Sequence, residues 1–125
     1  MEGRTIFAIL FFIQYLWDRL TSSCITWIGE ALLIVHHLVS IYIFIGGFIF
    51  NPKYHLITLM LIIIHWKTNQ NRCILTEWTN MYCGHEKDKY FEDLNVKLGL
   101  REMNPNIHWY IFALLLFYDI HKINK

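Results

Sequence analysis

The chain has 125 residues, enough for one domain, and a formal net charge of +1. Hydrophobic residues make up 55% and charged residues 17%, whereas soluble domains have roughly 45–50% and roughly 25%. Basic and acidic residues are mixed along the chain, which excludes the basic footprint of a nucleic-acid-binding protein. The apolar excess is clustered in segments too long for a small soluble core, so the composition indicates an integral membrane protein.

The first apolar run, Thr5–Leu16, is strongly aromatic and is followed by Trp17-Asp18-Arg19, which predicts a first helix over residues 4–20. It is not followed by the small-x-small cleavage pattern of a signal peptide. Its length lies between that of a full span and that of a helix lying in the membrane interface. We favour a tilted spanning helix, with an interfacial helix as the alternative.

A transmembrane hairpin is predicted between Glu30 and Trp66. Its first apolar run, Ala31–Phe50, has no Asp, Glu, Lys or Arg, and about 20 such residues in a helix cross a hydrocarbon core of about 30 Å. A second run, Tyr54–Ile64, follows after Asn51-Pro52-Lys53, which is turn chemistry. Near the end of the first run, Gly46-Gly47 allows a neighbouring helix to approach closely.

A charged connector separates the hairpin from the last span. Within it, Cys73–Cys83 has apolar residues at helical spacing, which predicts a membrane-hugging helix that ends at Gly84. Glu86–Leu100 carries most of the charge but keeps one apolar face, which predicts an amphipathic surface helix.

The predicted fold is all-α: a single transmembrane domain over residues 1–125, built as a bundle of three to four spans. The expected spans are residues 4–20, 24–50, 53–67 and 106–122, with a membrane-surface connector at 68–105. Lys and Arg counts near the spans favour the connector side as the cytoplasmic side.

The histidines inside the apolar runs are the candidate functional residues. His36 lies 14 residues before Phe50 and His65 lies 12 residues after Lys53. At a rise of about 1.5 Å per residue both are about 20 Å from the turn, so they share a depth in the membrane. The candidate cluster at this level consists of Glu30, His36, His37, His65, Cys73, Glu77 and His108. His55 and His121 are expected at the opposite surface.

Histidine, cysteine and carboxylate side chains are transition-metal ligands, and two histidines at one depth on different helices can hold a haem iron. The chain has no H-x-x-x-H and no C-x-x-C pattern. We therefore predict neutral, hydrogen-bonded histidines and no cofactor. The alternatives are a haem or transition-metal site and a proton-handling site.

Three cysteines, an odd count, argue against a disulfide scaffold. On a helix, Cys73 and Cys83 would lie about 15 Å apart, beyond the limit of about 7 Å for disulfide-bonded Cα atoms. We predict two free thiols there, and Cys24 is interpreted as a small apolar residue near an interface.

The stretch from His65 to Glu77 is predicted to fold back on the open end of the hairpin, at the level of His36 and His37. Residues 68–72 are polar and must turn away from lipid. An imidazole hydrogen bond to Glu77 or to a backbone carbonyl would then satisfy both partners.

The order of motifs resembles an uncharacterised family of small polytopic bacterial inner-membrane proteins, known only as a domain of unknown function. The resemblance begins at about Leu32 and rests on a histidine before Gly46-Gly47, His55 in the next helix, and a C-x-L-T motif at Cys73–Thr76. It implies that the histidine pair and the C-x-L-T residues form one local structure. It implies no activity.

The predicted function is that of a structural or assembly subunit of a membrane complex or virion membrane, with the bilayer and other proteins as partners. No catalytic residue and no enzymatic activity are predicted. The alternative is a redox or metal-binding protein that uses the histidine cluster. Frequent Ile, Asn and Lys suggest an AT-rich genome, such as that of a large DNA virus, a protist or an organelle.

Overall fold

The computed structural model describes residues 2–21, 24, 26–84 and 98–125, and these residues form helices joined by turns. The helices are α1 (Gly3–Thr21), α2 (Trp27–Ile49), α3 (Pro52–Thr68), α4 (Ile74–Tyr82), α6 (Leu100–Met103) and α7 (Ile107–Ile123). The predicted all-α fold is thus confirmed for the described part of the chain. The four long helices begin and end within three residues of their predicted bounds.

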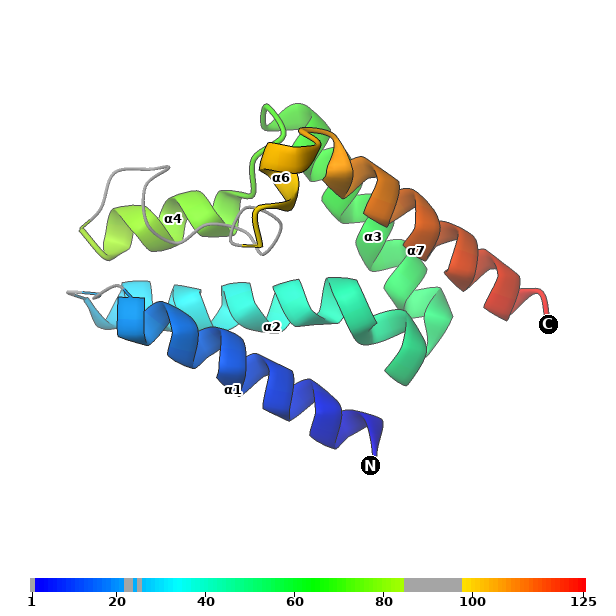
Figure 1. Ribbon diagram of the computed structural model, residues 1–125, viewed down its shortest axis with the longest axis horizontal. Coiled ribbons are helices and arrows are strands. Elements are labelled where there is room, and N and C mark those ends of the chain that lie inside the picture. Colours follow the sequence, from blue (N-terminus) through cyan, green and yellow to red (C-terminus); the bar gives the residue numbers. More distant parts are fainter. Residues whose placement is uncertain (1, 22–23, 25, 85–97) are drawn as a thin grey trace.

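Helix α2 is the central element (Figure 1). α1 packs along it on one side, and α4 lies beside its first half on another. α3 meets α2 at the turn and then diverges from it, while α7 packs along α3. The hairpin is therefore a V, closed at the turn and open toward α4 and the start of α7.

The helix ends follow from local side chains. Thr26 caps α2, and its side chain accepts a hydrogen bond from the Gly29 amide at 3.0 Å. Asn51 caps α3 in the same way, with Pro52 at a first-turn position where its missing N–H costs nothing. After α3, Gln70 and Asn71 adopt positive φ and reverse the chain.

Many large apolar side chains lie on the surface of the described residues, whereas much of the interior is polar. Exposed large side chains include Phe12, Leu61 and Phe117, which are 58%, 62% and 74% exposed. The buried polar and charged residues outnumber the buried hydrophobic ones, the reverse of a soluble core. These buried polar residues are Gln14, Asp18, His36, His37, Ser40, His55, Glu77, Thr79, Asn80, His108 and Asp119.

Among the helices of the described segments, α2, with 23 residues, is the one long and apolar enough to cross a membrane. α3 and α7 have 17 residues each. The structure thus supports a helical protein with one candidate membrane span.

Helix α4 is the helix predicted within Cys73–Cys83, and Gly84, at φ 80°, ends it as expected. It exposes Trp78 and Met81 but buries Thr79 and Asn80. Most of the amphipathic helix predicted at 86–100 lies outside the described residues, which resume at Leu98 and lead into α6.

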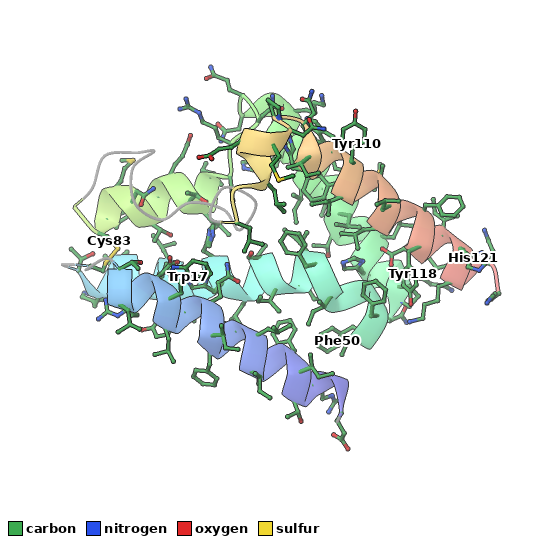
Figure 2. All side chains as sticks on the ribbon, viewed as in Figure 1. Trp17, Phe50, Cys83, Tyr110, Tyr118 and His121 are labelled. Atoms are coloured by element: carbon green, nitrogen blue, oxygen red, sulfur yellow. A yellow bond between two sulfur atoms is a disulfide. The ribbon has the colours of Figure 1, made fainter. Side chains whose placement is uncertain are left out.

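A disulfide joins Cys24 and Cys83, with their Cα atoms 4.3 Å apart (Figure 2). The prediction of a free thiol at Cys83 is therefore wrong, and so is the interpretation of Cys24 as merely a small apolar residue near an interface. The packing of the helices explains the bond, because α4 runs back along α2 and brings Cys83 to the start of α2. Gly29 leaves the necessary space, since a Cβ there would lie 2.6 Å from each sulfur. Cys73 is free, as predicted.

Candidate functional site

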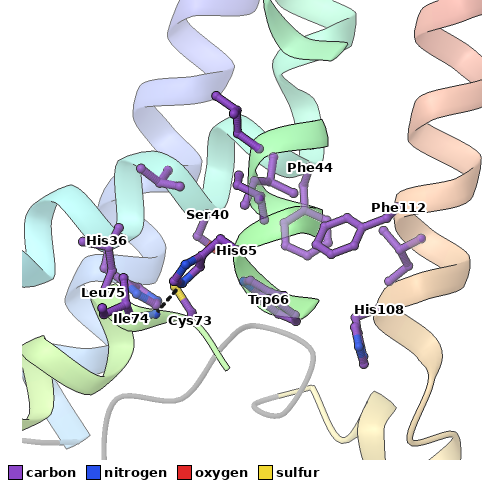
Figure 3. A pocket seen from close by; sticks show the side chains of 15 residues that line it. His36, Ser40, Phe44, His65, Trp66, Cys73, Ile74, Leu75, His108 and Phe112 are labelled. Atoms are coloured by element: carbon purple, nitrogen blue, oxygen red, sulfur yellow. Dashed lines mark hydrogen bonds between the residues drawn. The ribbon is translucent and has the colours of Figure 1, made fainter. Parts of the chain in front are cut away.

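A cavity of about 280 Å³ lies in the open end of the V, between α2, α3, the start of α4 and the start of α7 (Figure 3). Most of its lining is apolar. Four of the predicted cluster residues also line it, namely His36, His65, Cys73 and His108. The sequence therefore placed these four at one site, and the structure confirms that they border one space.

His36 reaches the cavity from α2 and is 95% buried. Its Nδ1 lies 3.2 Å from the hydroxyl oxygen of Thr76 on α4. This bond uses one ring nitrogen and ties α4 to the middle of α2. The other nitrogen, Nε2, has no hydrogen-bond partner among the described residues.

His65 reaches the cavity from the last turn of α3. Its Nε2 accepts a hydrogen bond from the backbone N–H of Ile74 at 3.1 Å. Because Nε2 is the acceptor, the neutral ring carries its proton on Nδ1. The Nδ1–H group has no hydrogen-bond partner within the described residues.

The fold-back predicted for 65–77 is confirmed by these two contacts, which join the open end of the hairpin to the start of α4. The partners differ from those predicted. His36 bonds to Thr76 rather than to Glu77, and His65 accepts a backbone N–H rather than donating to a carbonyl.

The other predicted cluster members lie elsewhere. His37 turns to α1, where its Nε2 is 2.8 Å from Asp18 Oδ2, although the two are not aligned for a hydrogen bond with each other. Glu30 accepts a hydrogen bond from the Tyr15 hydroxyl and pairs with Arg19 at 3.1 Å. Consecutive residues on a helix point about 100° apart, which explains why His36 and His37 face different neighbours.

Glu77 is buried on α4 but does not line the cavity. Within the described segments, no three His, Cys, Asp or Glu side chains are arranged to hold a metal ion. The lone pair of His65 Nε2 is also engaged by Ile74. Most of the predicted metal ligands therefore bond to different neighbours in this structure, even where they border the same cavity.

A second buried polar site, which was not predicted from the sequence, lies at the closed end of the V. His55 Nδ1 lies 2.6 Å from Asp119 Oδ2, and both side chains are fully buried. The prediction of His55 at the surface is therefore wrong, whereas His121 is exposed as predicted. Two features of the sequence could have indicated this site: an Asp inside the last apolar run and a Gly-Gly pair that lets a neighbouring helix approach closely.

The glycine pair makes this contact possible. A Cβ on Gly47 would lie 2.3 Å from Asp119 Oδ1 and 2.8 Å from His55 Nδ1, and one on Gly46 would lie 2.8 Å from the His55 ring. Lys122 adds a hydrogen bond from Nζ to the Gly47 carbonyl at 3.0 Å. The close approach predicted for Gly46-Gly47 is confirmed.

Both nitrogens of His55 face acceptors. Nε2 lies 3.1 Å and 3.0 Å from the carbonyl oxygens of Tyr42 and Ile43, so it must carry a proton and donate it. One more proton lies between Nδ1 and the Asp119 carboxylate. The pair is closed on itself and offers no free nitrogen to a ligand.

The chain was compared with protein-family models, curated proteins and solved structures. None of the three comparisons finds a match. The resemblance to the family with the C-x-L-T motif therefore stays a prediction from the sequence.

Proposed function

We propose that this protein is a small polytopic membrane protein that serves as a structural or assembly subunit of a membrane complex or virion membrane. The observation that carries the proposal is the apolar described surface around a polar interior. Polar side chains inside membrane proteins face the bundle interior and pair with one another, while apolar side chains face lipid. The fold repeats this arrangement on α1, α3, α4 and α7.

The proposal of several spans rests on the helices that flank α2. A helix of 17 residues, such as α3 or α7, is about 26 Å long at about 1.5 Å per residue, a little less than a hydrocarbon core of about 30 Å. Short spans are accommodated by local thinning of the bilayer or by assembly with neighbouring helices. A subunit inside a larger assembly would supply such neighbours.

The disulfide supports an orientation opposite to the one that the Lys and Arg counts favour. Cys24 and Cys83 lie on the connector side, and disulfides persist in oxidising compartments and are rare in the cytosol. For the orientation, we give the disulfide more weight than the small difference in Lys and Arg counts, because the bond forms only where an oxidant is present. We therefore propose that the connector side faces an oxidising lumen or exterior.

Carbonate extraction followed by crosslinking in native membranes tests both parts of the proposal. We expect the chain to stay in the membrane pellet and to crosslink to a stoichiometric partner. Release into the supernatant would overturn the membrane assignment. A monomer without a partner in mild detergent would overturn the subunit assignment and leave the membrane assignment standing.

The alternative prediction, a redox or metal-binding protein, has its own test in the absorption spectrum and metal content of the purified protein. A Soret band that disappears in His65→Ala would establish it. The contact between His65 Nε2 and the Ile74 amide argues against an iron ligand at that nitrogen, because the bond would first have to break.

A further inference from the structure

We propose that the cavity at the open end of the V binds one long-chain fatty acid, with the carboxyl group held by His36 and His65. The proposal rests on the cavity and its histidines and requires no protein partner, so it stands or falls separately from the subunit role.

The cavity is amphipathic. His36, His65 and Cys73 gather on one side of it, near the start of α4, whereas Phe44 and Phe112 lie on the other (Figure 3). Further apolar lining comes from Val39, Ile43, Leu61, Ile62 and Ile111. Mostly apolar walls with a few convergent polar groups are typical of small-molecule sites.

The polar side has hydrogen-bonding capacity that the described protein does not use. His65 presents an Nδ1–H donor, because its Nε2 accepts from Ile74. His36 has Nε2 left over, since Nδ1 faces Thr76, and this nitrogen carries a proton when Thr76 donates to Nδ1. Both histidines line the cavity, so two ring nitrogens without a partner in the described segments favour a ligand with acceptor oxygens. A carboxyl group has two.

The size and position of the cavity favour a single acyl chain. A volume of about 280 Å³ lies just below the range of roughly 300–1,000 Å³ for ligand pockets, which suits a slender ligand. Leu61 lines the cavity and is also 62% exposed, so the cavity borders the apolar outer surface. A lipid chain can therefore enter from the side without crossing water.

Cys73 provides a reporter inside the cavity. It is the free thiol among the three cysteines, because Cys24 and Cys83 are disulfide-bonded. We would measure maleimide labelling of Cys73 in the purified full chain, with sodium oleate or octadecene as the probe. If labelling occurs only in the empty state, oleate at about ten times its Kd slows it about tenfold. Octadecene, which has no oxygen, should slow it far less.

Two variants on neighbouring turns of α2 separate the cavity from the surface. Val39→Trp fills the cavity and should abolish the oleate effect, whereas Val35→Trp, at an exposed position outside the lining, should retain it. A chain with Val35→Cys and Cys73→Ser reports any general effect of the fatty acid on detergent micelles, and its labelling should not change.

Equal protection by octadecene and oleate would overturn the role of the histidines. No protection by oleate, or the same slowing at Val35→Cys, would overturn the proposal as a whole. The comparison of the two probes uses the unmodified protein, so it stands even if Val39→Trp fails to fold.

Discussion

The two ends of the hairpin use the same residue types to opposite effect. At the closed end, His55 has protein partners for both ring nitrogens, and Asp119 rests against Gly47. At the open end, His36 and His65 each have one partner within the described residues and border a cavity. Glycine allows the backbones to approach at the first end, whereas a cavity lies between α2 and α3 at the second.

A histidine inside an apolar helix does not by itself mark a functional site. What matters is whether the neighbouring helices come close enough to satisfy both ring nitrogens. We therefore assign a stabilising role to the closed end and keep the proposal of ligand binding for the open end.

Asp119→Leu should destabilise the protein most. It leaves the His55 ring buried without its acidic partner, and removing one member of a buried pair costs about 3–5 kcal/mol. The free energy of unfolding in detergent measures the loss. The double variant His55→Leu with Asp119→Leu should be less destabilised than Asp119→Leu alone, because it leaves no orphaned polar group. Equal losses in the single and double variants would contradict a paired closed end.

Loss of the disulfide should weaken the open end. Cys24→Ser, or reduction of the unmodified chain, is expected to cost about 2–4 kcal/mol, since the bond closes a long loop. Cys73→Ser serves as the matched control and should cost little, because that thiol is free. The midpoint of thermal unfolding with and without reductant is the measurement. A midpoint that does not respond to reductant would show that the bond is absent in solution.

Gly47→Ala tests the close approach at the closed end. Alanine gains about 1 kcal/mol of helix propensity over glycine, but overpacking costs about 1–3 kcal/mol. The added Cβ meets the buried Asp119 carboxylate at 2.3 Å, so we expect a net loss of about 1–2 kcal/mol. Gly3→Ala is the matched control, because the atoms nearest to its Cβ belong to the flexible Ile49 side chain. A stabilised Gly47→Ala protein would contradict the proposed role of the glycine.

Helix positions could be predicted from the sequence because they depend on local patterns. The long apolar runs and the Asn51-Pro52 turn fix α2 and α3, and depth along two antiparallel helices places His36 and His65 together. These inferences need only the rise per residue and the position of the turn.

Contacts that depend on helix rotation could not be predicted. Whether His37 faces α1 or α4 depends on how the helices pack, and so does the distance between Cys24 and Cys83, which are 59 residues apart. An odd number of cysteines argues against a disulfide only if all three behave alike, whereas here two are bonded and one is free. The His55–Asp119 pair was missed because His55 was placed by its distance from the turn and not by its neighbours.

Thr76→Val should produce the smallest effect, and it tests how α4 is held at the open end. Valine has nearly the shape of threonine but removes the hydroxyl that lies 3.2 Å from His36 Nδ1. A hydrogen bond of this kind contributes about 0.5–1.5 kcal/mol, so a loss of that size in the free energy of unfolding is expected. Thr58→Val is the matched control: the Thr58 hydroxyl bonds only to the Tyr54 carbonyl one turn earlier, and its loss should cost less. In Thr76→Val both nitrogens of His36 are free to meet the cavity, so a fatty acid should stabilise this variant at least as much as the unmodified chain. If ligand stabilisation disappears instead, Thr76 is needed to orient the His36 ring, and the hydrogen bond belongs to the binding site rather than to the packing of α4.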